Sequence, residues 1–456
     1  MTTTEKLLDL REKQKRHFES GSTLPISQRK KVLRKLLEII EAHQADIEHA
    51  LFLDLGKSSF EAVATEIGYV RKEIKSFLKN LEAWTAPIKV NTPILITGPA
   101  SGKIVYQPKG NVLIISPWNY PFQLVMAPLA GALAAGNTAV IKPSEFSSNT
   151  EKLIAKIIRA NFDESVVAVV TGGVEETQAL LQLPWDHIFF TGSTKVGKIV
   201  MRAAAEHLSP VTLELGGKSP TVIAADANIK LAAKRIAWGK FINAGQTCIA
   251  PDYVMVHQSV RSKFRDELDK NILAFFGSNP VESSFYGKII SERHFERLQE
   301  MMPEKELANK AERYIPPTFI ELSINDAHTS MDEEIFGPIL PIITYNDNQE
   351  VFEFIKKRPR PLALYVFCSN RNLQKRFETE THSGGLVFND VIMHIANPEL
   401  PFGGIGESGM GSYHGKFSIE CFSHKKPVHK ASTSIDIPLR YPPYKDWAKK
   451  LVNWLF

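Results

Sequence analysis

The chain has 456 residues, of which 43% are hydrophobic and 23% are charged, a composition typical of an ordered protein with two or three domains. The formal net charge is only +5, and acids are interspersed among the basic residues, so we expect no nucleic-acid partner. The three cysteines are far apart and odd in number, which favours a reducing, cytoplasmic location and predicts neither disulfides nor a metal site. Charged residues interrupt the first twenty positions, so a secretory signal is not expected.

Helical periodicity dominates residues 27–82 and predicts two or three amphipathic helices. Residues 84–108 are rich in proline and in β-forming residues, and the alternation in 103–107 indicates the strands of an exposed arm. Such an arm can be exchanged between subunits, so we expect a homodimer. The apolar stretch 124–141 contains Pro128 and Gly136 and is interpreted as a helix, a turn and a buried strand, not as a membrane span.

Short apolar runs alternate with helix-length segments from Gly110 to Gly217, which predicts a doubly wound parallel sheet. The predicted strands cover residues 112–116, 138–142, 166–171, 187–191 and 211–215. A second α/β unit follows from about Gly216 to Pro398. Its strands are expected near residues 221–224, 253–257, 339–345 and 364–368.

Cys248 lies among small residues in Asn243-Ala-Gly-Gln-Thr-Cys248, a segment unlike an ordinary core strand. A thiol attacks a carbonyl as the thiolate, so a catalytic cysteine needs help in losing its proton. Glu214 precedes two glycines that allow a ligand to approach the backbone closely, and a carboxylate there suits a general base. Together these residues point to covalent catalysis at an aldehyde or an ester, although an isolated cysteine is more often a small buried hydrophobe.

A strand turns at Gly192 and a helix opens at about Ser193, with Gly197 in its first turn. A helix N-terminus stabilises a pyrophosphate, but this spacing is not the usual dinucleotide fingerprint. Lys142 ends another predicted strand and Glu145 follows three residues later, where a carboxylate can bind ribose hydroxyls. Glu145 disfavours a 2′-phosphate and Lys142 attracts one, so NAD is preferred and NADP stays open.

Seven motifs, in order along nearly the whole chain, resemble the aldehyde dehydrogenase superfamily. They are Pro117-Trp-Asn-Tyr-Pro121, Lys142-Pro-Ser-Glu145, Phe190-Thr-Gly-Ser193, Glu214-Leu-Gly-Gly-Lys218, Gly245-Gln-Thr-Cys248, Glu334-Ile-Phe-Gly-Pro338 and Pro401-Phe-Gly-Gly404. The segments 246–253 and 422–427, with the short N-terminus, resemble the class 3 branch, which acts on fatty and aromatic aldehydes. The resemblance implies a Rossmann-type nucleotide-binding domain (1–83 and 104–212), a catalytic domain (213–398), an oligomerisation arm (84–103 and 420–440) and an amphipathic tail (441–456).

The resemblance also implies roles for single residues. Cys248 attacks the aldehyde, Asn119 holds the oxyanion with the Cys248 backbone N–H, and Glu214 activates the water that hydrolyses the thioester. Glu334 and Phe336 orient the nicotinamide ribose and ring. The rest of the cofactor is held by Trp118, Lys142, Glu145 and the turn through Gly192, Ser193 and Gly197. The substrate tunnel is expected to include Tyr120, Trp238, His394, Phe402 and His414.

The C-terminal residues 445–456 place Trp447, Leu451, Trp454 and Leu455 on one helical face, with lysines elsewhere. This pattern suits an interfacial helix, so we expect either peripheral membrane contact or docking on the protein's own surface. One departure from the family lies at 301–310, where glycine is absent and a helical turn is expected.

Three other functions remain open on the sequence alone. A semialdehyde dehydrogenase for a short charged substrate would need a cationic anchor in the tunnel, and none is obvious. A catalytically silent scaffold would have no need for Cys248, Glu214 and Asn119 together. A thiol esterase would leave the predicted nucleotide site without a purpose. The sequence therefore favours NAD(P)-dependent oxidation of an apolar aldehyde.

Overall fold

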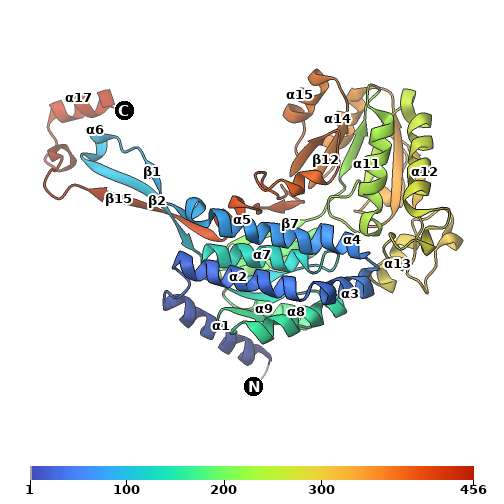
Figure 1. Ribbon diagram of the computed structural model, residues 1–456. Helices are drawn as coiled ribbons and strands as arrows, with labels where there is room; N and C mark the ends of the chain where they lie inside the picture. Colours follow the sequence, from blue (N-terminus) through green and yellow to red (C-terminus); the bar gives the residue numbers. More distant parts are fainter. Residues whose placement is uncertain (1–2, 456) are drawn as a thin grey trace.

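The computed structural model describes residues 3–455 and contains three β-sheets (Figure 1). The first sheet has the order β14-β7-β6-β3-β4-β5, parallel except for the short antiparallel strand β14. Its strands are β3 (Asn111–Ile115), β4 (Thr138–Lys142), β5 (Val167–Val169), β6 (His187–Gly192), β7 (Val211–Leu215) and β14 (Gly409–Met410). The helices between them are α7 (Gln123–Ala135), α8 (Ser148–Asn161), α9 (Val174–Leu181) and α10 (Thr194–Ala205). The predicted doubly wound sheet is confirmed, and 124–141 forms the expected helix, turn and strand.

The second sheet is fully parallel in the order β10-β11-β9-β8-β12-β13. Its strands are β8 (Pro220–Ile223), β9 (Tyr253–His257), β10 (Thr318–Ser323), β11 (Ile339–Tyr345), β12 (Ala363–Phe367) and β13 (Gly385–Phe388). The helices are α11 (Ile229–Phe241), α12 (Arg261–Phe276), α14 (Asn348–Lys356) and α15 (Arg371–Glu380). All four predicted strands are present within one residue. The edge strands β10 and β13 were not predicted; both are only partly buried, and β13 is four residues long.

Helices from the N-terminal part cover the first sheet (Figure 1). They are α1 (Thr3–Glu19), α2 (Ile26–Ala42), α3 (Gln44–Leu55), α4 (Ser59–Ala62), a π-helical turn η1 (Val63–Ile67) and α5 (Gly68–Thr85). Helix α7 is buried along its whole length and packs against α2 and α5. Two expectations are wrong here: α1 precedes the predicted helical region, and Trp84 belongs to α5 instead of the β-rich segment.

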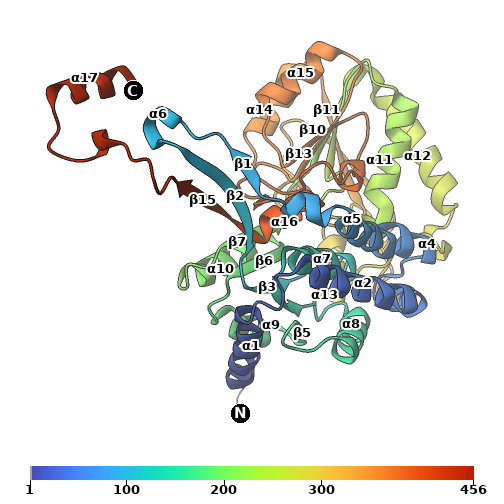
Figure 2. The same cartoon turned by 60° about the vertical axis from the view of Figure 1, so that its left-hand side comes forward.

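A third sheet, β1-β2-β15, forms an arm that extends away from the body (Figures 1 and 2). Strands β1 (Ile88–Val90) and β15 (Ser423–Ala431) flank β2 (Ala100–Pro108), and the short helix α6 (Ile94–Thr97) lies at the tip. Helix α17 (Asp446–Leu455) also lies at the tip, near α6 (Figure 2). Within residues 3–455, no helix combines the length and apolarity needed to cross a membrane. The remaining helices include α13 (Glu292–Gln299), α16 (Lys416–Cys421) and a 3₁₀ turn η5 (Lys305–Leu307) in the glycine-free segment, where a turn was expected.

Candidate active site

Cys248 lies in a sharply turned loop after α11 and the 3₁₀ turn η2 (Ile242–Gly245). Asn243, Ala244 and Gly245 have left-handed backbone, with φ of 51°, 51° and 75°. A Cβ at Gly245 would overlap the carbonyl oxygen of Gly337, so this position needs glycine for both space and conformation. Backbone strain of this kind is concentrated at functional sites. The predicted small-residue segment is therefore a loop that presents the thiol, and part of the Cys248 surface stays accessible.

The thiol of Cys248 is a protonated group at rest. Protein surrounds the sulfur on most sides, and this burial raises its pKa to about 12, with further contributions from the charges of Glu334 and Glu214. The backbone N–H groups of Cys248 and Ile249 donate to the sulfur and act in the opposite direction. Because these N–H groups favour the anion and burial disfavours it, the thiolate needs a nearby base to form.

Glu214 is such a base. It lies on β7, opposite Gly409 of β14, and only 3% of its surface is exposed. Burial holds the pKa of its carboxyl well above the usual range, and neither oxygen has a hydrogen-bond partner within the described part of the chain. Once it has lost its own proton, a buried carboxylate with both oxygens free of protein partners can accept a proton from a thiol or from a water.

Asn119 lies in the loop between β3 and α7 and is 2% exposed. Its side-chain Nδ2 donates to the carbonyl oxygen of Gln246 at 3.0 Å, two residues before the nucleophile. That bond uses one of the two amide hydrogens and fixes the plane of the group. Asn119 is therefore coupled directly to the Cys248 loop, as expected of an oxyanion donor.

The predicted phosphate-binding turn joins β6 to α10. Gly192 ends β6, and Ser193 caps α10, its Oγ accepting the backbone N–H of Val196 at 3.4 Å. Gly197 packs on Leu215, and a Cβ there would lie 2.7 Å from that side chain, so the helix approaches the sheet closely. The first turn of a helix of twelve residues presents amide groups that suit a pyrophosphate.

Lys142 and Glu145 lie together after β4. Lys142 is 2% exposed and donates from Nζ to the Pro143 carbonyl at 2.7 Å and to a Glu145 carboxylate oxygen at 3.5 Å. Glu145 remains partly exposed. A buried ammonium beside an accessible carboxylate at the carboxyl end of a parallel strand fits the hydroxyl-rich ribose of a dinucleotide.

Glu334 lies against the glycines that follow Glu214, and Phe336, two residues later, lies against Trp118. A Cβ at Gly216 would overlap the Glu334 carboxylate, and the backbone N–H of Gly217 donates to that carboxylate. Burial raises the pKa of Glu334 to about 8, with Asp252 adding to the effect. Phe336 has a φ of 54° and contacts the ring of Trp118 edge-on, with centroids 5.3 Å apart. Glu334 at the glycines and the ring pair of Trp118 and Phe336 thus lie on neighbouring parts of the chain, and all three residues are predicted for the cofactor.

His294 was not predicted for this region, yet it belongs there. Its Nε2 hydrogen-bonds the Phe336 carbonyl at 2.8 Å, its ring lies 5.5 Å from that of Trp118, and burial lowers its pKa to about 4. No sequence signal marks it, because a histidine on an amphipathic helix resembles any half-buried polar residue.

Three of the five predicted tunnel residues form one aromatic group. The rings of Phe402 and His414 are stacked at 5.0 Å, and His394 lies 6.0 Å from Phe402. Tyr413 joins the group with its ring 4.0 Å from His414, a contact that sequence reasoning missed. Both ring nitrogens of His414 lack a partner among the described residues, although the side chain is only 1% exposed. The group is therefore mainly apolar, with unused hydrogen-bonding capacity at both imidazoles and at the Tyr413 hydroxyl.

The other two predicted tunnel residues have different surroundings. Tyr120 is 8% exposed, and its hydroxyl bonds the hydroxyl of Thr247 at 2.7 Å, so it supports the nucleophile loop. Trp238 is 37% exposed on α11. A Cβ at the neighbouring Gly239 would overlap Val391, so this part of α11 packs on the segment that leads to His394.

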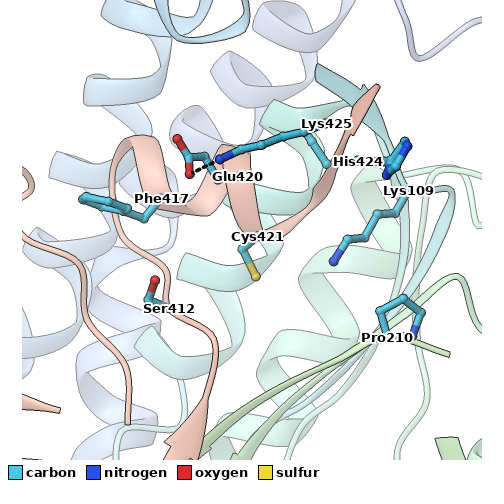
Figure 3. A pocket seen from close by; sticks show the side chains of 9 residues that line it. Lys109, Pro210, Ser412, Phe417, Glu420, Cys421, His424 and Lys425 are labelled. Carbon is cyan, nitrogen blue, oxygen red and sulfur yellow. Dashed lines mark hydrogen bonds and ion pairs between the residues drawn. The ribbon is translucent and has the colours of Figure 1, made fainter. Parts of the chain in front are cut away.

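A separate hollow of about 500 Å³ lies at the base of the arm (Figure 3). Lys109 and the sulfur of Cys421 point toward each other across it, and Glu420 pairs with Lys425 at its rim (Figure 3). None of the predicted catalytic, cofactor or tunnel residues lines this hollow. The candidate active site is therefore the region around Cys248.

Residues 2–428 match the aldehyde dehydrogenase family. The chain is 48% identical over 438 residues to the 4,4'-diaponeurosporen-aldehyde dehydrogenase of Staphylococcus aureus (strain NCTC 8325 / PS 47), covering 94% of this chain and 95% of the relative. It is 44% identical over 451 residues to aldehyde dehydrogenase family 3 member H1 of Arabidopsis thaliana, covering 97% and 93%. The solved structure of a substrate-bound state of Staphylococcus aureus AldH superimposes with a TM-score of 0.95 at 45% identity, covering 99% of both chains. The chain therefore belongs to the aldehyde dehydrogenase family of NAD(P)-dependent oxidoreductases.

Proposed function

We propose that this aldehyde dehydrogenase oxidises apolar aldehydes, aliphatic or aromatic, through a thioester on Cys248. The observation that carries the proposal is a partly exposed Cys248 whose thiol feels the charge of a buried carboxyl, Glu214, with no protein partner on either oxygen among the described residues. Asn119 supplies the third element, because its amide is locked to the loop that presents the thiol.

The first step is proton transfer and attack. Glu214 takes the proton from the Cys248 sulfur, the sulfur forms a bond to the aldehyde carbon, and the π electrons move to oxygen. The second Nδ2 hydrogen of Asn119 and the Cys248 backbone N–H stabilise that oxyanion. Removing one such donor typically lowers turnover by about 10² to 10³-fold.

NAD(P)⁺, when bound, supplies the acceptor for the hydride that leaves the tetrahedral carbon. Trp118, Phe336 and Glu334 suit the task of holding the nicotinamide end, because Glu334 contacts the glycine that follows Leu215 and the rings of Phe336 and Trp118 pack together. Lys142, Glu145 and the N-terminus of α10 suit the ribose and the phosphates. Loss of the hydride leaves an acyl group on Cys248.

Hydrolysis uses Glu214 a second time. The carboxylate takes a proton from water, the oxygen attacks the thioester carbon, and the C–S bond breaks to release the acid and the thiolate. Glu214 must therefore return its first proton to solvent before the second transfer. Because its pKa is raised, the Glu214 carboxylate is a stronger base than an exposed glutamate. For the same reason a smaller fraction of Glu214 is ionised at a given pH, so activity should increase as the pH rises.

The preference for an apolar aldehyde rests on the aromatic group of Phe402, Tyr413, His394 and His414. These side chains offer ring faces and carry no carboxylate or guanidinium that would pair with a charged substrate. The Staphylococcus relative is named for a diaponeurosporen-aldehyde. A short charged semialdehyde finds no cationic anchor in this group.

The test is absorbance at 340 nm with NAD⁺ or NADP⁺ and straight-chain aldehydes of increasing length. We expect kcat/KM to rise with chain length, and Cys248→Ala to abolish the signal. Equal kcat/KM for short charged and long apolar aldehydes would contradict the apolar tunnel. Nucleotide-independent ester cleavage without aldehyde oxidation would contradict the reaction itself.

The arm supports a homodimer. Strand β15 pairs with β2 over nine residues, and its other edge has no strand partner within residues 3–455. An open edge of this length is a template for pairing with a second chain. Light scattering should give twice the chain mass of 51.1 kDa, and Val428→Pro, which adds a second proline beside Pro427, should shift the mass toward the monomer. A wild-type monomer at micromolar concentration would refute the dimer.

The tail supports peripheral contact with a membrane. Trp447 and Trp454 on α17 are 58% and 77% exposed, and residues 422–456 contain seven Lys or Arg against two Asp or Glu. Basic and aromatic residues of this kind bind anionic lipid interfaces. Flotation with vesicles of anionic lipid should carry the protein upward, and deletion after Tyr444 should abolish it. If the full-length and the truncated protein float equally, the role of the tail is refuted. If only the truncated protein stops floating and it is still a dimer, the role of the tail is supported.

A further inference from the structure

Lys57 and Glu66 form a buried ion pair next to residues 116–122, the segment between β3 and α7 that carries Asn119 and is called the oxyanion loop. Both side chains are fully inaccessible, and Lys57 Nζ donates to a Glu66 carboxylate oxygen. Lys57 follows Gly56, the left-handed C-cap of α3, and Glu66 lies in the π-helical turn η1. A π-helical turn inserts one extra residue and is frequent at functional sites. Two local irregularities thus bring the charges together.

The pair makes four contacts with the oxyanion loop and with the first residue of α7. Lys57 Nζ donates to the backbone oxygen of Asn119 at 2.9 Å and lies 3.8 Å from the centre of the Tyr120 ring. The other carboxylate oxygen of Glu66 accepts the backbone N–H groups of Phe122 at 2.9 Å and Gln123 at 3.1 Å. Glu66 therefore caps the start of α7, while Lys57 contacts Asn119 and Tyr120 in the loop that leads to this helix.

The same backbone oxygen connects to the nucleophile loop. Asn243 Nδ2 donates to the Asn119 oxygen at 2.8 Å and to the Gln246 oxygen at 3.1 Å, and Asn119 Nδ2 donates to that Gln246 oxygen as well. Tyr120 reaches Thr247 through its hydroxyl. The backbone oxygen of Asn119 thus accepts hydrogen bonds from Lys57 and from Asn243, which lies in the loop that carries Cys248.

We propose that Lys57, held by Glu66, is a positioning residue for the oxyanion hole: it sets the Asn119 peptide relative to Cys248 without touching the substrate. The proposal rests on the oxyanion role of Asn119 given above. A bond from a charged donor is short and directional, and a buried network is rigid only while every member is satisfied. Catalytic donors misplaced by 1 Å lose much of their effect, so a small shift of this peptide has a large effect on rate.

Lys57→Met tests the idea, because methionine keeps most of the volume and removes the donor. We expect kcat with aldehyde to fall about 10- to 100-fold, below the limit set by loss of an oxyanion donor. Alkylation of Cys248 by iodoacetamide is a displacement that forms no oxyanion, so its rate should stay within about 2-fold of wild type. Nucleotide affinity, measured by quenching of tryptophan fluorescence, should change equally little.

A double-variant cycle separates positioning from general destabilisation. In an Asn119→Ala background the donor is already gone, so adding Lys57→Met should lower kcat by less than about 3-fold. If Asn119→Ala is itself harmless, the oxyanion role fails. If Asn119→Ala is damaging and Lys57→Met lowers kcat by the same factor in both backgrounds, the positioning role fails.

If Lys57→Met alone is too unstable to assay, a double variant that removes the charges of both Lys57 and Glu66 tests the proposal instead. Lys57→Met with Glu66→Gln leaves no unpaired buried charge, and glutamine still accepts from the start of α7, so thermal stability should recover. We expect kcat to remain low in this stable protein. Recovery of kcat together with stability would overturn the proposal.

A matched control is Arg29→Met. Arg29 is also a buried cation that donates to backbone carbonyls, those of Thr23 and Ala134, but it lies between α2 and α7 away from Cys248. This variant should lower stability and leave kcat of the folded protein unchanged. A fall in kcat as large as that of Lys57→Met would show that any buried cation has the same effect, and would refute a specific role for Lys57.

Discussion

Replacing Glu61 with glutamine should stabilise the enzyme at alkaline pH and not at acidic pH. Glu61 lies on α4, 8% exposed, and one carboxylate oxygen has no hydrogen-bond partner among the described residues. Burial raises its pKa from 4.5 to about 7, against the opposing influences of the Lys57 charge and of the backbone N–H of Asn243, with the Glu66 charge acting in the same direction as burial. Lys57 is already paired with Glu66, so Glu61 has no cation of its own.

The sign follows from the raised pKa. A carboxyl that binds its proton more tightly in the folded state stabilises the fold fully below pH 4.5, and this stability is lost as the pH rises through 7. The difference of about 2.5 pKa units corresponds to about 3 kcal/mol. Glutamine stays neutral and can still accept the Asn243 N–H, so the variant avoids this loss.

The assay is thermal unfolding of wild type and Glu61→Gln at pH 5 and at pH 8. Unfolding entropy of about 2.1 cal/mol/K per residue gives roughly 1 kcal/mol per degree for a chain of this length, so 3 kcal/mol is about 3 °C. Because pH 5 already lies above the unfolded pKa of 4.5, about 2.5 kcal/mol is lost between the two pH values, and the Tm of the variant should gain about 2.5 °C on the wild type. The exposed Glu38→Gln is the control and should show no such gain. A Tm difference for Glu61→Gln that does not change with pH would refute the reasoning.

Three further outcomes follow from the site. Glu214→Gln should slow both the first turnover of NAD(P)H formation in stopped flow and the steady state, because attack and hydrolysis both lose their base; a first turnover at the wild-type rate would contradict the role in attack, and an unchanged steady state would contradict the role in hydrolysis. Trp118→Ala should raise the KM for the nucleotide several-fold with little effect on aldehyde affinity, and an unchanged KM would place Trp118 outside the cofactor site. Gly245→Ala should lower Tm and kcat together, because the left-handed backbone and the Gly337 carbonyl leave no room for a Cβ.

Sequence reasoning located the strands and the catalytic motifs because both depend on local patterns. Strands β9 and β11 begin and end at the predicted residues, because buried parallel strands are rich in apolar residues. Cys248, Glu214 and Asn119 stood out through the residues around them. The edge strand β10 alternates apolar and polar residues toward its end and was missed.

Contacts made in three dimensions could not be predicted in this way. Lys57 and Glu66 are nine residues apart on segments that look like ordinary charged helix ends, and nothing local shows that both are fully buried. Their exposure is decided by the packing of the N-terminal helices on α7. His294 and Tyr413 were missed for the same reason, because each is defined by its ring neighbours and not by its sequence context.

The titratable groups around Cys248 impose an order on the chemistry. Burial raises the pKa of Cys248 to about 12 and that of Glu334 to about 8, and it holds the pKa of Glu214 well above its usual range. All three groups therefore favour their neutral forms at rest, and the thiol keeps its proton until Glu214 has lost its own. Each ionised carboxylate in turn raises the pKa of the thiol, so a thiolate is most stable immediately after it has given its proton to Glu214. Proton transfer and attack on the aldehyde are thus coupled, which limits the time in which the sulfur stands as a free thiolate open to oxidation.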